Sequence, residues 1–343
     1  MLKISIPYYS DSSVYFEIIR HFDWPVFLDS SYQESMPKNN LVRFDVLTAR
    51  PFIKISMLED RVHVYNVSLN TIEKKDADPF IILENLMSKY QLPKSELPFT
   101  GGALGYFSYD IKNKAQKENV IPGMQFGIYD WAFIIDHHTK KALIVSANFQ
   151  DDTSDFIKDL SASINKSLPS KDTFYLTNDI KSSMNKGMYK KKFDSVKNYL
   201  RMGDCYQVNI SKKYRVESKG DPWILYKKFR NINKSPFMAY IKFDDITLLS
   251  GSPERFIKSD SNIVTTRPIK GTAARQSKKV DDDKKKEILQ NSVKEKAENL
   301  MIVDLLRNDL GVNCKIGSIK VDELFTVESY PNVHHLVSSI SGI

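Results

Sequence analysis

The spacing of apolar residues marks out most of the first half of the chain. Arg61–Leu69 alternates apolar and polar side chains, which predicts a strand with one buried face. Pro79–Tyr90 repeats apolar residues at helical spacing behind a proline, a common first residue of a helix. Gly127–Asp136 and Lys141–Ala147 are typical of paired strands. The glycines that follow Thr100 match neither a dinucleotide loop nor a P-loop, so we expect them to allow close backbone packing.

The second half shows the same two periodicities more clearly. Ser167–Lys186 is polar and aperiodic, which indicates a linker. Tyr189–Leu200 carries one helical apolar stripe, and Gly203 closes it. Tyr206–Val216 alternates strictly and predicts a strand whose polar side either faces water or lines a polar cavity. Further short strands are expected at 237–243, 246–250 and 263–266.

A long helix is predicted from Asp282 to Leu310, where Gly311 ends it. Its last part, from Glu298 to Asp309, is apolar on nearly every side, which is typical of a buried helix. Glu298 and Asp304 are therefore expected to enter or border an interior. Buried carboxylates need partners, protons or a metal ion.

The overall composition fits a globular protein with two domains. The chain has 343 residues, of which 41% are hydrophobic and 27% charged. We expect an N-terminal domain at 1–150, a helix and polar linker at 151–186, and a second domain at 187–343. No apolar run could span a bilayer and no signal peptide is visible, so we expect a cytoplasmic protein without a membrane partner. Two cysteines cannot form a disulfide framework.

The formal charge of +8 raises the alternative of a nucleic-acid-binding protein. However, the most basic stretch, Lys278–Lys286, is interrupted by three aspartates. This pattern is typical of a solvated helix face. No nucleic-acid-binding motif is present, so we expect no nucleic-acid partner.

Three segments hold residues suited to chemistry. In Thr265–Thr272 a strand runs into Pro268, and Lys270 stands beside Gly271. A lysine amine becomes a nucleophile when burial or a nearby cation such as Arg267 lowers its pKa, but for this segment taken alone a surface lysine in a turn is the better explanation.

Ser252–Phe256 holds a carboxylate, Glu254, that could serve as general acid or base, with an ordinary ion pair to Arg255 as the alternative. Glu298 could bind Mg²⁺ through its oxygens. His334 and His335 are adjacent and must point in different directions, so at most one would serve a given site, and core packing is the alternative for both.

Taken in order, these motifs resemble the chorismate-utilising enzymes over essentially the whole chain. The resemblance rests on the segments Gly203–Ser211, Ser252–Phe256, Arg267–Thr272, Lys296–Gly311 and Val333–Ser338. It implies an α+β fold like that of anthranilate synthase component I, with two antiparallel β-sheets packed as a sandwich and helices outside. Anthranilate and salicylate synthases place alanine where this chain has Lys270, whereas aminodeoxychorismate synthases place lysine.

The resemblance therefore implies synthesis of 4-amino-4-deoxychorismate from chorismate and ammonia, a step towards 4-aminobenzoate and folate. Lys270 would be the nucleophile, Glu254 the general acid and His335 an active-site histidine. Gly271 and Thr272 would contact substrate, and Glu298 would bind Mg²⁺. Anthranilate synthase component I is the alternative within the family.

Two partners are implied besides chorismate. A separate glutamine amidotransferase subunit would supply ammonia. Family members also hold L-tryptophan in the N-terminal domain, which implies a site on this chain, with plain packing as the alternative role of these residues. The matching residues are Ser30, Leu41, Val42, Arg43, Phe44, Pro236, Phe237 and Met238.

The family sequence continues beyond the histidine motif, where this chain reaches Ile343. The resemblance thus implies a C-terminally truncated copy that lacks a second Mg²⁺ glutamate and an arginine for the substrate carboxylate. An inactive remnant that binds tryptophan or the amidotransferase is the alternative to an interrupted enzyme subunit.

Overall fold

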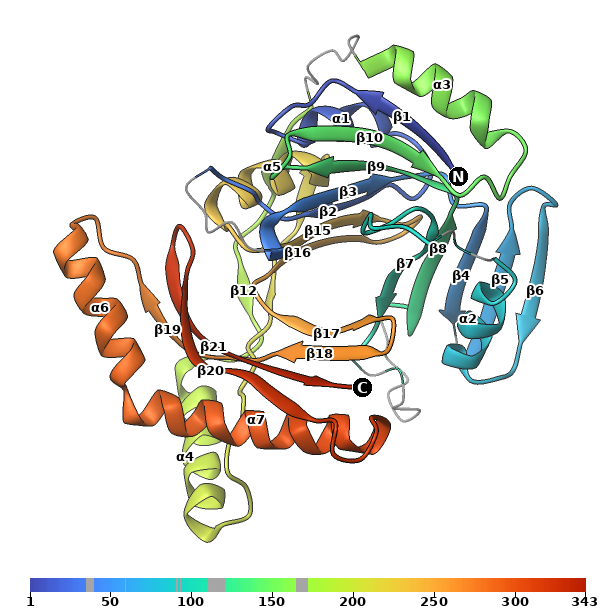
Figure 1. Ribbon diagram of the computed structural model, residues 1–343. Helices are drawn as coiled ribbons and strands as arrows, with labels where there is room; N and C mark the ends of the chain where they lie inside the picture. Colours follow the sequence, from blue (N-terminus) through green and yellow to red (C-terminus); the bar gives the residue numbers. More distant parts are fainter. Residues whose placement is uncertain are drawn as a thin grey trace. The chain divides into compact units, whose positions relative to one another are not determined.

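A computed structural model describes residues 1–34, 40–58, 60–90, 92, 94–109, 111, 121–164 and 172–343 (Figure 1). The chain divides into two compact units. One unit combines 1–169 with 229–343, and the other comprises 170–228. All residues with a predicted catalytic or binding role belong to the first unit.

The first unit contains a large antiparallel sheet, here called sheet A. Its strands follow the order β1 (Leu2–Ile6), β10 (Lys141–Ser146), β9 (Trp131–Asp136), β3 (Phe44–Thr48), β2 (Val26–Asp29), β15 (Phe237–Lys242) and β16 (Thr247–Ser252). β15 and β16 lie far along the chain, beyond the expected domain limit at 187, yet β15 pairs with β2 from Val26 to Asp29. Residues from both halves of the sequence therefore build this one sheet.

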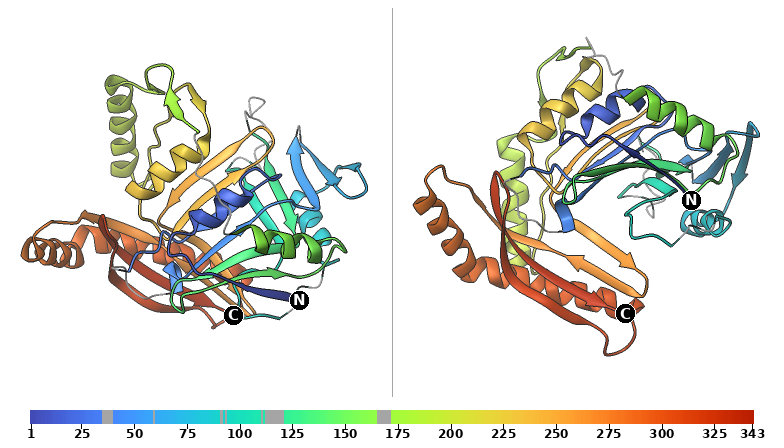
Figure 2. Two further views of the ribbon diagram at one scale, coloured as in Figure 1. Left: turned by 90° about the horizontal axis from the view of Figure 1, so that it is seen from above. Right: turned by 45° about the horizontal axis from the view of Figure 1, so that its top comes forward.

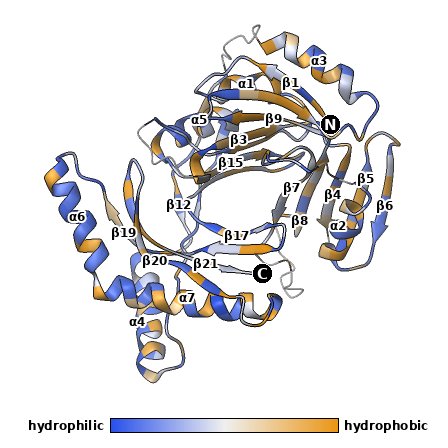
Figure 3. Cartoon of the chain, in the orientation of Figure 1, coloured by the Kyte–Doolittle hydropathy of each residue, from blue (hydrophilic) through white to orange (hydrophobic). Residues whose placement is uncertain are grey.

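Aromatic residues fix α1 (Ser13–Ile19) and α3 (Thr153–Ser163) on one face of sheet A. Trp131 and Phe133 alternate along β9, so their side chains share that face. The ring of Phe133 contacts Tyr15 of α1, and the ring of Trp131 contacts Phe156 of α3. Figure 2 shows both helices on this side of the sheet. Figure 3 shows the hydrophobic residues that run along its strands.

The opposite face of sheet A contacts a second antiparallel sheet, sheet B. Its strands follow the order β6 (Thr71–Lys75), β5 (Arg61–Asn66), β4 (Ile53–Leu58), β8 (Met124–Tyr129) and β7 (Gly102–Phe107). Tyr129 is fully buried among Trp24, Val26 and Phe243. The helix α2 (Pro79–Met87) begins at Asp78, whose carboxylate accepts the N–H of Phe80, and buries its apolar residues against sheet B.

A third antiparallel sheet, sheet C, carries the motifs of the second half. Its order is β17 (Arg255–Asp260), β18 (Ile263–Arg267), β21 (Val333–Gly342) and β19 (Ile269–Ala274), with β20 (Lys320–Ser329) also paired to β21. The helices α6 (Lys279–Asn291) and α7 (Val293–Asn313) follow β19. Val303 and Leu310 of α7 pack against Ile340 of β21.

The second unit is small. It contains the helix α4 (Lys186–Met202) and two short antiparallel pairs, β11 (Phe174–Leu176) with β14 (Ser218–Gly220) and β12 (Lys181–Ser182) with β13 (Tyr214–Arg215). Gly203 ends α4 at φ 80°, which confirms the predicted stop. The helix α5 (Pro222–Ile232) crosses the limit between the units, and the 3₁₀ turn η1 (Asn40–Val42) lies in the first. No helix of the described residues is long and apolar enough to cross a membrane.

Several predictions of secondary-structure elements from the sequence were wrong. Within the expected strand 206–216, only Tyr214–Arg215 pairs in a sheet. The expected strand 127–136 is two strands, because the chain passes from sheet B to sheet A at Asp130. The expected linker contains β11 and β12, although its residues 167–171 lie outside the described part, as does Asp110 of the glycine-rich segment.

The expected long helix is also different in the structure. It divides at Ser292, whose hydroxyl caps α7 by accepting the N–H of Glu295. Leu300, Met301 and Leu305 are about half exposed, and Asp304 is exposed beside Arg307. The prediction that this segment is buried on all sides was therefore wrong.

Candidate active site

The predicted acid and the predicted nucleophile meet where β17 and β19 begin. Glu254 immediately precedes β17, and Lys270 is the second residue of β19. The Glu254 carboxylate accepts the backbone N–H of Ile269 at 2.8 Å, so it lies beside the residue that precedes Lys270. The Ser252 hydroxyl bonds the Glu254 backbone and fixes the turn. The alternative of a simple ion pair with Arg255 does not describe this carboxylate.

Lys270 lies in an irregular stretch of β19. The register with β21 shifts between Ile269 and Thr272, which places Lys270 and Gly271 in a bulge. Bulges redirect side chains and are frequent beside active sites. Within the described part of the chain, the half-buried Lys270 amine has no hydrogen bond or ion pair.

Arg267 does not act as the expected lone cation near Lys270. Its guanidinium forms an ion pair with Glu328, and Glu323 lies 3.5 Å away. The hydroxyl of Tyr330 donates to the other oxygen of Glu328 at 2.9 Å. Two carboxylates therefore balance the charge of Arg267.

His335 and Thr272 are paired across β21 and β19. Thr272 Oγ1 lies 3.0 Å from His335 Nδ1, and the two residues are in register. Burial, together with the nearby His334, lowers the pKa of His335. The imidazole is therefore neutral at neutral pH and suited to accept or pass on a proton.

The adjacent histidine serves another purpose. His334 Nε2 lies 3.1 Å from Asp282 Oδ1, and its Nδ1 lies 2.8 Å from the Ser329 hydroxyl. Asp282 also accepts from Arg275 and from the N–H of Gln276. As expected for neighbours on a strand, the two histidines have different partners, and only His335 bonds to the predicted substrate segment.

Gly271 brings β19 close to α7. Its φ of 92° lies in a region that side-chain-bearing residues rarely adopt, and an added Cβ would meet Glu295 at 3.1 Å. Glu298 stands one helical turn after Glu295 on α7. The sequence pointed to Glu298 alone, and the contact with Gly271 adds Glu295.

The donor set on α7 fits a hard cation only in part. Lys294 Nζ lies 3.5 Å from Glu298 and 3.6 Å from Glu295, so both carboxylates already share a cation. Among the described residues there is no cluster of three groups that could hold a metal. Mg²⁺ commonly takes one or two carboxylates and completes its shell with water and substrate oxygens, and these two glutamates meet that minimum.

The residues matched to a tryptophan site come from neighbouring segments of sheet A and η1. Ser30 follows β2, Phe44 begins β3, and Phe237 and Met238 lie on β15, with Pro236 buried just before them. The Arg43 guanidinium lies 4.4 Å from the Phe44 ring centroid. The structure therefore brings these side chains into one region.

Most of these residues also have partners within the protein. Arg43 forms two hydrogen bonds with Asp136, at 3.1 and 2.7 Å. Val42 is fully buried against Tyr330, while its neighbour Leu41 is only partly buried. A packing role thus stays open beside the ligand role.

Beside them lies a buried polar network that the sequence did not reveal. Asp45 accepts the N–H and hydroxyl of Ser30 at 2.7 Å, and its other oxygen lies 2.9 Å from His137 Nε2. Asp29 binds Arg230 at 2.7 Å. These partners lie far apart in the sequence, so no local spacing could have identified the network.

Comparison with known proteins places these observations in a family. A profile described as chorismate binding enzyme matches residues 55–343. Aminodeoxychorismate synthase component 1 of Escherichia coli K12 is 37% identical over 338 residues, which cover 96% of this chain and 72% of the relative. Anthranilate synthase component 1 of Saccharolobus solfataricus is 36% identical over 294 residues, covering 82% and 65%. The crystal structure of anthranilate synthase component I from Streptococcus pneumoniae aligns with a TM-score of 0.73 at 26% identity, over 91% of this chain and 70% of that one. This similarity confirms the expected fold class.

Proposed function

The chain belongs to the chorismate binding enzyme family, and we propose that it replaces the C4 hydroxyl of chorismate by an amino group, which yields 4-amino-4-deoxychorismate. The observation that carries the proposal is the contact of Glu254 with the Ile269 N–H, one residue from an unpaired Lys270 amine. A carboxyl group held against the residue that precedes the amine can act on the same substrate ring.

The proposed reaction has two stages. The neutral Lys270 amine attacks C2 of the ring, the double bonds shift, and the C4 oxygen leaves as water after Glu254 protonates it. Ammonia then adds to C4, the double bonds return, and the lysine amine is released. Covalent catalysis of this kind replaces one difficult displacement by two easier steps.

His335 and the glutamates of α7 support this chemistry. His335 is neutral because burial lowers its pKa, so it can hold a proton near Thr272. Gly271 lets β19 approach α7 closely, because a side chain at this position would meet Glu295. Glu298, with Glu295, would hold Mg²⁺, which would neutralise a substrate carboxylate.

We also propose two partners. The Escherichia coli relative is named a component, and a separate glutamine amidotransferase subunit would supply the ammonia for this chain. L-tryptophan would bind at Ser30, Arg43, Phe44 and Met238, where a guanidinium, a hydroxyl and apolar side chains gather.

A trapping experiment tests the reaction. The protein is incubated with chorismate, Mg²⁺ and an ammonium salt, quenched, and analysed by mass spectrometry. We expect an adduct on Lys270 that is absent in Lys270→Ala and kept in Lys258→Ala, a lysine of the same sheet that pairs with Asp260 at the surface. An equal amount of adduct on the Lys270→Ala protein would exclude Lys270 as the nucleophile. Anthranilate as the main product would assign the chain to the alternative reaction.

A further inference from the structure

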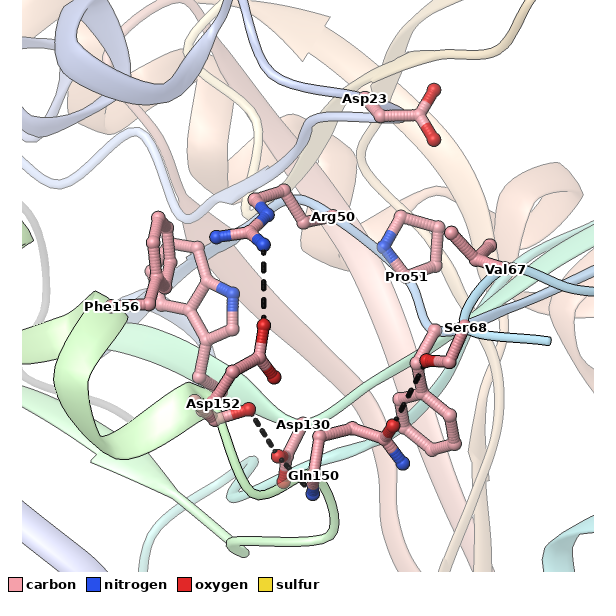
Figure 4. A pocket seen from close by; sticks show the side chains of 12 residues that line it. Asp23, Arg50, Pro51, Val67, Ser68, Asp130, Gln150, Asp152 and Phe156 are labelled. Atoms are coloured by element: carbon pink, nitrogen blue, oxygen red, sulfur yellow. Dashed lines mark hydrogen bonds and ion pairs between the residues drawn. The ribbon is translucent and has the colours of Figure 1, made fainter. Parts of the chain in front are cut away.

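A small cavity lies away from the residues proposed to act on chorismate. It has a volume of about 160 Å³ and lies between the start of α3 and the loop before β4 (Figure 4). An apolar cavity of roughly 150 Å³ is large enough to hold benzene, so this one has room for a single six-membered ring. Its apolar walls come from Pro51, Phe52, Val67, Trp131 and Phe156.

Arg50 provides a cationic group in this cavity. Its guanidinium lies 4.1 Å from the Phe156 ring centroid, which fixes its plane. The carboxylate nearest to it is Asp152 at 3.6 Å, too far for a good hydrogen bond, and the Asp152 side chain is 74% exposed. The guanidinium N–H donors of Arg50 thus have only this weak contact with a carboxylate among the described residues. Figure 4 shows Arg50 and Asp152 facing each other beside Phe156.

The backbone holds Arg50 in an unusual conformation. Its φ is 59°, and its N–H donates to the Asp23 carbonyl at 2.7 Å. Non-glycine residues in this region tend to occur at ligand-binding and active sites. The Asp23 carboxylate is itself engaged by Lys54 at 2.9 Å, so it competes little for the guanidinium.

Two further donors indicate an anionic ligand. The side chain of Asp152, the N-cap residue of α3, makes no capping hydrogen bond, so the positive end of the helix dipole lies beside the cavity without a carboxylate bonded to it. Trp131 is 2% exposed, and within the described residues its indole N–H has no hydrogen-bond partner. Asp130, in contrast, has its charge satisfied by the N–H groups of Phe149 and Gln150.

We propose that this cavity binds a small monocarboxylate with one six-membered ring. The ring would pack between the aromatic walls, and the carboxylate would replace Asp152 on the Arg50 guanidinium. Planar carboxylates match a guanidinium through two parallel hydrogen bonds. A second negative charge would be disfavoured by Asp152 and Asp23, which selects monoanions over phosphates. This inference does not depend on the proposed reaction.

Titration with benzoate tests the site, with neutral benzamide as the matched ligand. Calorimetry is expected to show benzoate binding that weakens at least about tenfold in Arg50→Gln, since a bidentate charged contact is lost. Asp152→Asn should bind roughly threefold more tightly, because a weak internal competitor is removed. Asp151→Asn, a change of the same charge on the neighbouring exposed residue, should leave affinity unchanged.

A nuclear magnetic resonance readout locates the ligand. The chain has three tryptophans, and the Trp131 indole signal can be assigned by Trp131→Phe. This signal should shift with benzoate while those of Trp24 and Trp223 stay in place. Three results would each overturn the proposal: no benzoate binding, equal affinity for benzamide, or unchanged benzoate affinity in Asp152→Asn. The Asp152→Asn measurement remains decisive even if Arg50→Gln fails to fold.

Discussion

Replacing Arg230 by methionine is expected to destabilise the unit that contains sheet A by about 3–5 kcal/mol. This is the usual effect of removing one partner of a buried ion pair. Arg230 donates to Asp29 at 2.7 Å and to Asp11 at 2.7 Å. The Asp29 side chain is fully buried, whereas that of Asp11 is 58% exposed. The substitution therefore leaves a buried carboxylate without its guanidinium partner, although this carboxylate still accepts the Ser31 N–H at 2.7 Å.

The pH dependence of the variant's stability provides a second, independent test of this prediction. Burial and the neighbouring Asp45 raise the pKa of Asp29, and Arg230 opposes this rise. Without Arg230 the pKa of Asp29 in the folded protein rises further. Between the ordinary aspartate pKa of about 3.9 and that raised value, the folded state binds a proton that the unfolded state has released. The stability of the variant therefore increases as the pH falls, and its deficit is largest in alkaline solution.

Urea unfolding followed by tryptophan fluorescence measures both effects, since Trp24 and Trp131 are buried in this unit. Lys228→Met removes an exposed cation from the same helix and should change stability by less than about 0.5 kcal/mol. Adding Asp29→Asn to the Arg230 variant should recover part of the loss, because the unbalanced charge is gone. A loss below about 1 kcal/mol, or one that is equal at acidic and alkaline pH, would refute the reasoning.

Three further outcomes are expected from the same structure. Gly271→Ala should lower the free energy of unfolding by about 1–3 kcal/mol, because a side chain at φ 92° is strained and its Cβ would meet Glu295. Gly317→Ala is the control for backbone strain alone, since Gly317 has a φ of 79° but open space around it. Thermal unfolding of both variants measures the difference. Asp130→Asn should cost about 1–3 kcal/mol in a urea titration, since an amide has one accepting oxygen, whereas the N–H groups and the hydroxyl now converge on two. For His335 the folded-state pKa is lowered, so the unfolded chain binds the extra proton and stability falls as the pH drops through about 6.5. His335→Gln should reduce this slope in unfolding titrations, and an unchanged slope would mean that His335 is not the group responsible.

Local patterns predicted those elements whose own residues determine them. The helix at Pro79 was visible because Asp78 and the proline define its start and an apolar stripe defines its buried face. The strand at Arg61 was visible because its alternation matches the burial of Val62 and Val64 in the cluster that includes Ile82 and Leu86 of α2. These features depend on neighbours a few residues away, and the structure confirms them.

Elements whose state depends on distant partners were not predictable in this way. Tyr206–Val216 alternates as a strand does, yet most of it finds no strand to pair with, and alternation alone cannot supply one. The apolar residues of α7 suggested burial on all sides, but the helix packs on sheet C and leaves Leu300, Met301 and Leu305 about half exposed. At Asp130 the chain changes sheets because the carboxylate binds the N–H groups of Phe149 and Gln150, a contact that spans about twenty residues.

The candidate site shows the same division between residue identity and geometry. The types of Glu254 and Lys270, and their order along the chain, can be read from the sequence, whereas the hydrogen bond from the Ile269 N–H to Glu254 follows only from the way β17 and β19 begin beside each other. This contact has a mechanistic consequence, because the segment that carries the amine also orients the carboxyl group. The Ile269 N–H thus joins the Glu254 carboxylate to the segment that carries Lys270. The relation of this pair to Thr272 and His335 depends instead on the register with β21, which resumes immediately after the bulge. In the proposed reaction, placement of the substrate would thus depend on this bulge, in which Gly271 lies against Glu295.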